Sequence, residues 1–183
     1  MNIIPTAIPD ILIIEPRVHE DERGYFFESY QLERFQQAGL PIDFVQDNEA
    51  LSRGPVLRGL HYQRYFPQGK LVRVVAGVVW DVAVDIRQSS PTFGQWVGEE
   101  LSADNHRMLY IPPGFAHGYC SLTDVTIFQY KCTDVYHPDD EYGIRWNDPD
   151  LAITWPLAAT PRISAKDKEL PVLKDQRKDL LFD

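Results

Sequence analysis

The sequence predicts an all-β protein folded as a jelly roll, a double-sheet sandwich with a few short peripheral helices. Its middle part is a succession of short segments rich in Val, Ile, Tyr, Phe and Trp, separated by Gly, Pro, Asn and Asp. Windows with helical periodicity are scarce. About ten short strands in a chain of 183 residues are typical of a jelly roll, which closes most sheet edges and encloses a cavity.

The clearest strands are the arms of a predicted hairpin, Leu71 to Val75 and Val78 to Ile86, joined by two residues. In the second arm, apolar residues alternate with Asp81, Ala83 and Asp85, the period of two expected of a half-buried strand. The other predicted strands are Ile11 to Ile14, Tyr25 to Tyr30, Asp43 to Ala50, Val56 to Gln63, Gln95 to Leu101, Met108 to Ile111, Gly118 to Leu122 and Val125 to Thr133.

Helical segments are expected only at the periphery. Leu32 to Ala38 is predicted to form a short helix, since its apolar residues share a face and Gly39 is placed to end it. Ser164 to Asp167 and Asp175 to Leu181 are expected as helical turns packed on the outside. Because no repeat, low-complexity segment or long linker divides the chain, residues 1–183 are predicted to form one domain.

Charge and composition exclude several classes of function. The chain has 18 Lys and Arg against 27 Asp and Glu, a net charge of −9, which argues against nucleic-acid or anionic-membrane binding. No signal peptide or membrane span is visible, so a cytoplasmic protein is expected. Cys120 and Cys132 lack the spacing of a redox motif or zinc site and are predicted to be reduced, half-buried thiols.

Two of the five histidines have unusual settings. His61 follows Arg58 and Gly59, and a glycine bulge between them would re-aim two side chains that otherwise lie on opposite strand faces. His117 follows a Pro- and Gly-containing turn that would place it at a strand entrance. From the residues alone, each imidazole is either a catalytic or ligand group or a hydrogen-bonded structural side chain.

The turn before His117 and the GVVWDV segment are similar to those of cupins, whose jelly roll encloses a site. Many cupins hold a metal through an HxH pair, a Glu and a later His. Here the residues after His61 are Tyr62 and Gln63, so the pair is missing. Because a bound transition metal usually needs three or more protein ligands, no metal site is expected.

A closer resemblance covers nearly the whole chain, from about residue 2 to residue 175. In the same order, the segments DERGYFFE, VQDNEALS, VLRGLHYQ, QGKLVRVVAGVVWDVAVDIR, SPTFGQW, YIPPGFAHGY, YKCTDVY and ISAKD resemble those of the dTDP-4-dehydrorhamnose 3,5-epimerase family. The resemblance implies a cupin-type jelly roll, a homodimer, and neither metal nor organic cofactor. It also implies the substrate dTDP-4-dehydro-6-deoxy-D-glucose, a dTDP-4-keto-6-deoxyhexose on the route to dTDP-L-rhamnose.

Inversion beside a ketone requires a base, a stabiliser of the enolate oxygen, and an acid on the far side of the ring. The resemblance implies that His61 is the base and that Asp167 orients its imidazole. It implies that Tyr130 is the proton donor and that Lys70 is the cation beside the ketone. Without the family, Asp167 is a surface carboxylate, Tyr130 a packed strand aromatic and Lys70 a solvated lysine.

The resemblance also implies the residues that bind the nucleotide sugar. They are the cations Arg23, Arg58 and Lys166, the imidazole of His117, the thymine-stacking ring of Tyr136, and the polar residues Glu28, Gln46, Asn48 and Glu141. Because early strands of one family subunit help complete the neighbour's pocket, Arg23 and Glu28 are expected to act in trans. In the loop RYFPQG, where family members vary, Tyr65 and Phe66 either cover the site or pack.

Two other readings of the function remain open from the sequence. A relative that inverts only C3 or only C5 would carry much the same motifs. A cupin that merely binds a ligand, or one that depends on a metal, is the alternative from another class, and the missing HxH pair argues against its metal form.

Overall fold

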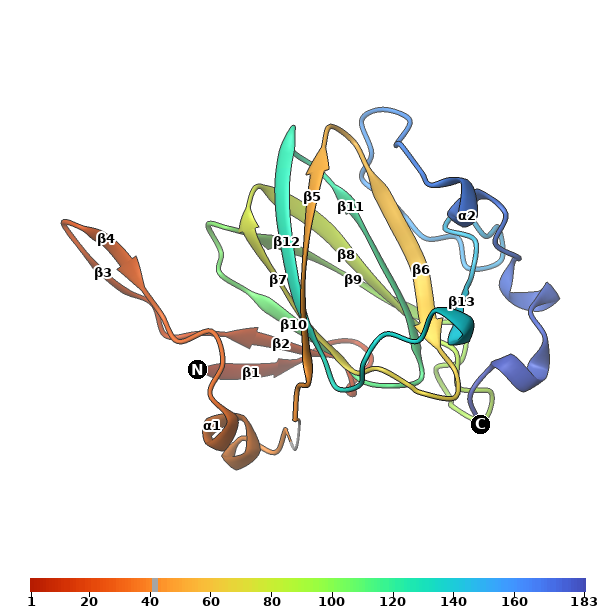
Figure 1. Cartoon of the computed structure of the whole chain (residues 1–183), viewed down its shortest axis with the longest axis horizontal. Coiled ribbons are helices and arrows are strands. Elements are labelled where there is room, and N and C mark those ends of the chain that lie inside the picture. The colour runs from red at the N-terminus through yellow and green to blue at the C-terminus, as the bar shows by residue number, and fades with distance from the viewer. Residues whose placement is uncertain (41–42) are drawn as a thin grey trace.

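Two antiparallel sheets pack face to face in the computed structural model, which describes residues 1–40 and 43–183 (Figure 1). One sheet has six strands, in the order β1 (Asn2–Pro5), β2 (Leu12–Glu15), β10 (Met108–Ile111), β7 (Lys70–Ala76), β12 (Val125–Cys132) and β5 (Gln46–Arg53). The other has five, in the order β13 (Glu141–Gly143), β6 (Leu57–Gln63), β11 (Phe115–Ser121), β8 (Val78–Asp85) and β9 (Trp96–Ser102). The prediction of an all-β fold is confirmed.

Helices are few and lie outside the sheets, as predicted. Helix α1 (Leu32–Gln37) is capped by Gln31 and ends before Gly39, and its buried residue is Phe35. Helix α2 (Ala165–Lys168) is capped by Ser164. Three 3-10 turns complete the set: η1 (Pro138–Asp140), η2 (Leu173–Asp175) and η3 (Lys178–Leu180). Among the described residues no helix is long and apolar enough to cross a membrane.

The main core fills the space between the two sheets. Val72 and Phe128 from the six-stranded sheet meet Val79, Ala83 and Tyr119 from the five-stranded sheet, and all five are buried. Such burial of apolar side chains is the main favourable term in folding. The row of β8 that carries Val79 and Ala83 therefore faces the interior of the sandwich.

The outer face of the five-stranded sheet is covered as well. Val82 and Val84 pack there against Ile144, Leu151 and Leu181 from the C-terminal part of the chain, which runs along this side of the molecule (Figure 1). Strand β8 is thus buried on both faces. The prediction of a half-buried β8 is wrong, because the row expected to be exposed, with Asp81 and Ala83, faces the other sheet, while the C-terminal part of the chain covers the apolar row.

The N-terminal region departs most from the predicted strands. Instead of one strand over Tyr25 to Tyr30, β3 (His19–Asp21) pairs with β4 (Gly24–Phe26) in a hairpin. This hairpin stands away from both sheets (Figure 1). The aromatic residues of β4 correctly predict an extended segment. Its partner, β3, contains only polar residues, so the apolar pattern does not predict that strand.

Candidate active site

Two adjoining cavities open between the sheets. The inner one, of about 410 Å³, and the outer one, of about 330 Å³, share His61, Lys70, Tyr130 and Glu141 in their walls. These four side chains come from β6, β7, β12 and β13, so both sheets contribute to the shared wall.

His61 is hydrogen-bonded to a buried carboxylate. Its Nε2 lies 2.7 Å from Oδ1 of Asp167, a residue 106 positions later in the chain and only 3% exposed. Burial works toward a raised pKa for Asp167, but the hydrogen bonds from His61, the Gly59 backbone and the Ser164 side chain outweigh it, so that pKa lies below its usual range. Asp167 is therefore ionised at neutral pH, and the other ring nitrogen of His61 is left for the cavity.

The strand carrying His61 is distorted at Gly59, as the sequence predicts. The register between β6 and β11 shifts there, and Gly59 has a φ of +114°. A Cβ on Gly59 would lie 2.6 Å from Cα of Gly118 and 2.7 Å from the His117 carbonyl oxygen, so glycine alone fits this close approach. As a result Arg58 and His61, three residues apart, both line the inner cavity.

Tyr130 and Lys70 reach the same cavities from the six-stranded sheet. Burial raises the pKa of the Tyr130 phenol to about 12, with nearby Cys132 adding to the effect. Burial lowers the pKa of Lys70, while Cys132 and Glu141 act in the opposite direction. The phenol therefore keeps its proton at neutral pH, and the ammonium lies in surroundings where a positive charge acts strongly on a bound ligand. Tyr130 packs on the core and Lys70 is not a solvated lysine.

Glu141 gathers three polar groups at the mouth of the site. Tyr136 donates its hydroxyl to Oε2 of Glu141 at 2.6 Å, and the Lys166 ammonium pairs with the same oxygen. Oε1 of Glu141 lies 3.8 Å from Nδ1 of His61. Although burial opposes it, the bonds from Lys166 and Tyr136 hold the pKa of Glu141 below its usual range. The hydrogen bond to Glu141 raises the pKa of Tyr136 to about 12.

A second histidine–aspartate pair lies deeper in the sandwich. Nε2 of His117 is 3.0 and 2.9 Å from the two carboxylate oxygens of Asp81, which has no exposed surface. His117 is directly opposite His61 in the register of β11 and β6. Sequence reasoning did not recognise Asp81, because the alternating pattern of β8 placed it on the expected polar face. A signal was nevertheless present, since Asp81 and Asp85 flank a small residue, Ala83, in an otherwise apolar strand.

Comparison with known proteins gives the site its chemical context. A family model described as dTDP-4-dehydrorhamnose 3,5-epimerase matches residues 5–175. The chain belongs to this family. The dTDP-4-dehydrorhamnose 3,5-epimerase of Salmonella typhimurium is 55% identical over 175 residues, covering 94% of this chain and 96% of its own. The resemblance in eight sequence segments is thereby confirmed, and the protein is an epimerase, an isomerase of nucleotide sugars.

Solved structures of relatives support the same fold. A Legionella pneumophila dTDP-6-deoxy-D-glucose-3,5-epimerase, solved with dTDP-4-keto-L-rhamnose, superposes with a TM-score of 0.97 at 52% identity, covering 99% of this chain and 97% of its own. A 3'-monoepimerase from Streptomyces bikiniensis, solved with dTDP-quinovose, has a TM-score of 0.90 at 36% identity and covers 97% and 91%. The predicted cupin-type jelly roll is therefore confirmed, and the same fold serves both single and double epimerases.

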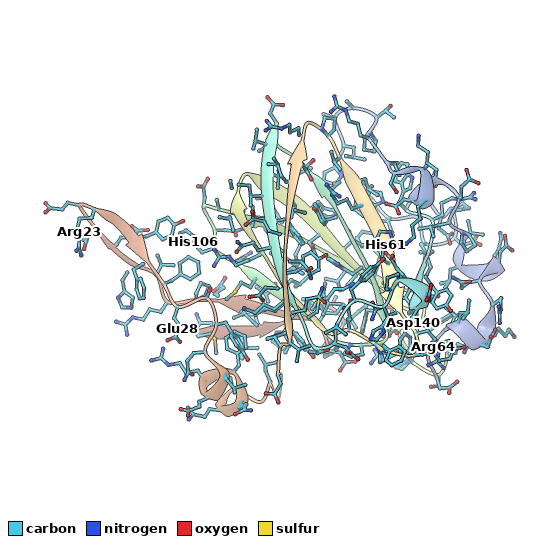
Figure 2. All side chains as sticks on the ribbon, viewed as in Figure 1. Arg23, Glu28, His61, Arg64, His106 and Asp140 are labelled. Carbon is cyan, nitrogen blue, oxygen red and sulfur yellow. The ribbon has the colours of Figure 1, made fainter. Side chains whose placement is uncertain are left out.

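Of the residues that the epimerase family implies for this site, all except Arg23 and Glu28 line one of the two cavities. Arg23 lies at the tip of the β3–β4 hairpin, on the far side of the molecule from His61 (Figure 2). Glu28, near the base of that hairpin, pairs with Arg34 at 3.1 Å. Of the four cations expected to gather, Arg58, Lys70 and Lys166 line the inner cavity, and Arg23 is remote from it within the chain.

Gln46 and Asn48 form a linked pair on β5 in the wall of the outer cavity. Gln46 donates to Asn48 at 3.0 Å and accepts the backbone N–H of Tyr136 at 2.9 Å. Asn48 in turn donates to Sγ of Cys132 at 3.6 Å. Cys120 and Cys132 are both free thiols with no exposed surface, more deeply buried than the sequence predicted.

The loop from Arg64 to Gly69 in this epimerase is anchored by Asp140 (Figure 2). The Asp140 carboxylate accepts the backbone N–H groups of Tyr65 and Phe66 at 2.9 and 2.8 Å. The Phe66 ring stacks on His137 with ring centres 3.9 Å apart, and neither aromatic of the loop lines the two cavities. Phe66 therefore packs on His137, and both rings lie outside the walls of the two cavities and remain 61% (Tyr65) and 47% (Phe66) exposed.

The described residues contain no group of three or more His, Cys, Asp and Glu side chains arranged to hold a metal ion. The imidazoles of the site instead face carboxylates: His61 faces Asp167, and His117 faces Asp81. Each imidazole thus has one nitrogen fixed by a hydrogen bond, an arrangement that suits proton transfer and oriented hydrogen bonding.

Proposed function

We propose that this epimerase inverts C5 and C3 of dTDP-4-dehydro-6-deoxy-D-glucose, using His61 as base and Tyr130 as acid. The observation that carries the proposal is the placement of a carboxylate-bound imidazole and a protonated phenol around one cavity, with a half-buried lysine in its wall. A carbon acid beside a ketone requires these three kinds of group.

The proton follows a simple route in this proposal. Because Nε2 of His61 is engaged by Asp167, Nδ1 takes the proton from the carbon beside the ketone. The electron pair of the broken C–H bond moves onto the ketone oxygen, where Lys70 stabilises the resulting enolate. At C5, Tyr130 then delivers its hydroxyl proton to the opposite face of that carbon. Exchange with solvent afterwards returns a proton to Tyr130 and removes one from His61.

The nucleotide part of the substrate meets the cations and polar groups around the same cavities. Arg58 and Lys166 supply positive charge for the diphosphate, and His117 contacts the sugar from the inner cavity. Tyr136, half exposed and fixed by Glu141, offers its ring to the thymine, and Gln46 and Asn48 supply polar contacts. The family's use of these positions supports each role.

We further propose that the protein is a cytoplasmic homodimer in which residues 1–183 form one domain. The β3–β4 hairpin supports this assembly, since Tyr25 and Phe26 are 57% and 71% exposed at positions where aromatics usually find a partner. Arg23 is too remote to serve its own chain's cavity (Figure 2). In the dimer, the hairpin brings Arg23 and Glu28 to the substrate held by the other subunit.

Deuterium wash-in tests the reaction. The wild-type protein is incubated with the 4-keto substrate in D2O, and NMR follows label at each carbon. Label is expected at both C3 and C5, because each inversion exchanges the carbon-bound proton through His61 or Tyr130. Folded protein that incorporates deuterium at neither carbon would refute the proposed function, and label at one carbon only would identify a single epimerase.

The role of Asp167 predicts a change in the pH profile. Its pKa lies below the usual range, so the carboxylate charge persists while the acidic limb of kcat/KM is traversed. In Asp167→Asn the carboxylate that orients the His61 ring is gone, so we expect kcat to fall about tenfold or more and the acidic limb of kcat/KM to shift. An Asp167→Asn protein with the wild-type rate and limb would contradict the pairing.

A further inference from the structure

Asp81 is a carboxylate between two apolar side chains in the interior row of β8. Its neighbours on the same face of β8 are Val79 and Ala83, and all three have no exposed surface. Burying a charge is costly unless it is paired, and an apolar residue in its place is often at least as stable. The packing of β8 thus gives no reason for a carboxylate at this position, and its partners must supply one.

The hydrogen-bond partner of Asp81 is a residue of the site. Both carboxylate oxygens lie within 3.0 Å of Nε2 of His117, so this nitrogen is the one that carries a proton. Nδ1 of His117 has no hydrogen-bond partner among the described residues and is available to a bound ligand. His117 and Asp81 are 8% and 0% exposed, so water competes little for their hydrogen bond.

Asp81 also acts on Lys70, which is half-buried. Lys70 lines the same inner cavity as His117, and three groups favour its charged form: Cys132 on β12, Glu141 on β13 and Asp81 on β8. In return, His117 and Lys70 favour the ionised form of Asp81, although burial raises the pKa of that carboxyl. Asp81 is therefore the shared counter-charge of two groups that face the cavity from opposite sheets.

We infer that Asp81 is a positioning residue for the epimerisation, acting through His117 and Lys70 on the enolate oxygen of the substrate. It holds His117 with Nε2 protonated and one ring orientation, and it keeps Lys70 charged in the closed interior. This role rests on the proposed function, since it assumes a reaction in which negative charge develops on a ketone oxygen. Asp81 itself touches neither the substrate nor the proton that is transferred.

The inference predicts where activity is lost as pH rises. Lys70 must keep its proton to stabilise the enolate, and burial lowers its pKa, so the basic limb of kcat/KM reports Lys70. Tyr130 does not set this limb, because its pKa is raised to about 12. Apart from His117, the other ionisable side chains in the wall of the inner cavity are retained in Asp81→Asn: Arg58, His61, Tyr119, Glu141, Lys166 and Asp167.

The test compares Asp81→Asn with a matched control, Asp85→Asn. Asp85 lies four residues along the same strand, equally buried, and bonds Arg87, Ser90 and Thr92, none of which lines either cavity. Asp81→Asn is expected to lower kcat about 10- to 100-fold and to move the basic limb down by about one pH unit. Asp85→Asn is expected to lower Tm and leave the limb in place. A folded Asp81→Asn protein with the wild-type basic limb would overturn the inference.

A measurement on the wild type keeps the inference testable if Asp81→Asn does not fold. In ¹⁵N NMR spectra of the histidine rings, with the His117 signals assigned by their loss in His117→Gln, Nε2 is expected to stay protonated between pH 6 and 9. A neutral ring protonated on Nδ1 would overturn the inference. The wild-type wash-in reports the proposed function separately, so a protein active at both carbons with a wild-type limb in Asp81→Asn would refute the role of Asp81 alone.

Discussion

Replacing His61 by Asn is expected to lower kcat by about 10²- to 10⁴-fold for exchange at both C3 and C5. The reason is that the amide cannot accept a proton from carbon. Asn is also too short to replace Nε2, so the hydrogen bond to Asp167 is lost together with the base. The measurement is NMR-detected exchange in D2O at each carbon, with dTDP binding followed by calorimetry. Binding of dTDP is expected to change little.

A matched control for this substitution is His106→Asn. His106 lies at the base of the hairpin, remote from His61 (Figure 2), and packs between Tyr25 and Phe27. Its φ of +55° is one that Asn adopts readily. His106→Asn should keep wild-type exchange at both carbons. Comparable exchange in His61→Asn and His106→Asn would remove His61 from the role of base.

Replacing Tyr130 by Phe is expected to keep exchange at C3 and to abolish inversion at C5, because the phenol is assigned to the far face of C5. The ring of Tyr130 packs against the core, with its centre 6.0 Å from the ring centre of Phe128. A phenylalanine at position 130 preserves that contact. What is lost is a proton donor whose pKa is raised to about 12 and which is fully protonated at pH 7. Product analysis by NMR distinguishes a C3 epimer from the doubly inverted sugar.

Tyr119→Phe is the corresponding control, because Tyr119 also lines the inner cavity and stacks on Phe128 at 4.0 Å. It should retain both inversions. Equal survival of the C3 and C5 inversions in Tyr130→Phe would contradict the assigned role. The outcome also addresses single epimerases: the Streptomyces bikiniensis 3'-monoepimerase shares this fold with a TM-score of 0.90, so the fold itself does not decide how many centres are inverted.

The strand pattern was largely predictable because alternating Val, Ile and aromatic residues encode sheet faces directly. The pattern does not show which distant segment of the chain covers a given face of a sheet. The C-terminal part, with Leu151 and Leu181, buries the outer side of β8, and only the folded chain reveals it. The apolar row of β8 therefore faces this segment, and the row with Asp81, which the pattern predicts to be exposed, faces the other sheet, where Asp81 pairs with His117.

The site shows the same division between local and distant information. The glycine bulge before His61 was predictable, since Gly59 separates two polar residues at an odd spacing. The pairing of His61 with Asp167 spans 106 positions, and no local pattern singles out that carboxylate in its charged segment. The family resemblance supplied Asp167, whereas Asp81 lay within a recognised strand and was identified only from the structure.

The close approach at Gly59 couples two properties that are often adjusted separately. Arg58 and His61 take their direction from this one point in β6, and the Gly59 N–H itself is 3.3 Å from Oδ2 of Asp167. Any side chain at position 59 would push β6 away from Gly118 and displace all three groups together. Substrate affinity and the rate of proton abstraction would then fall together. A substitution at position 59 therefore cannot improve one of these two properties at the expense of the other.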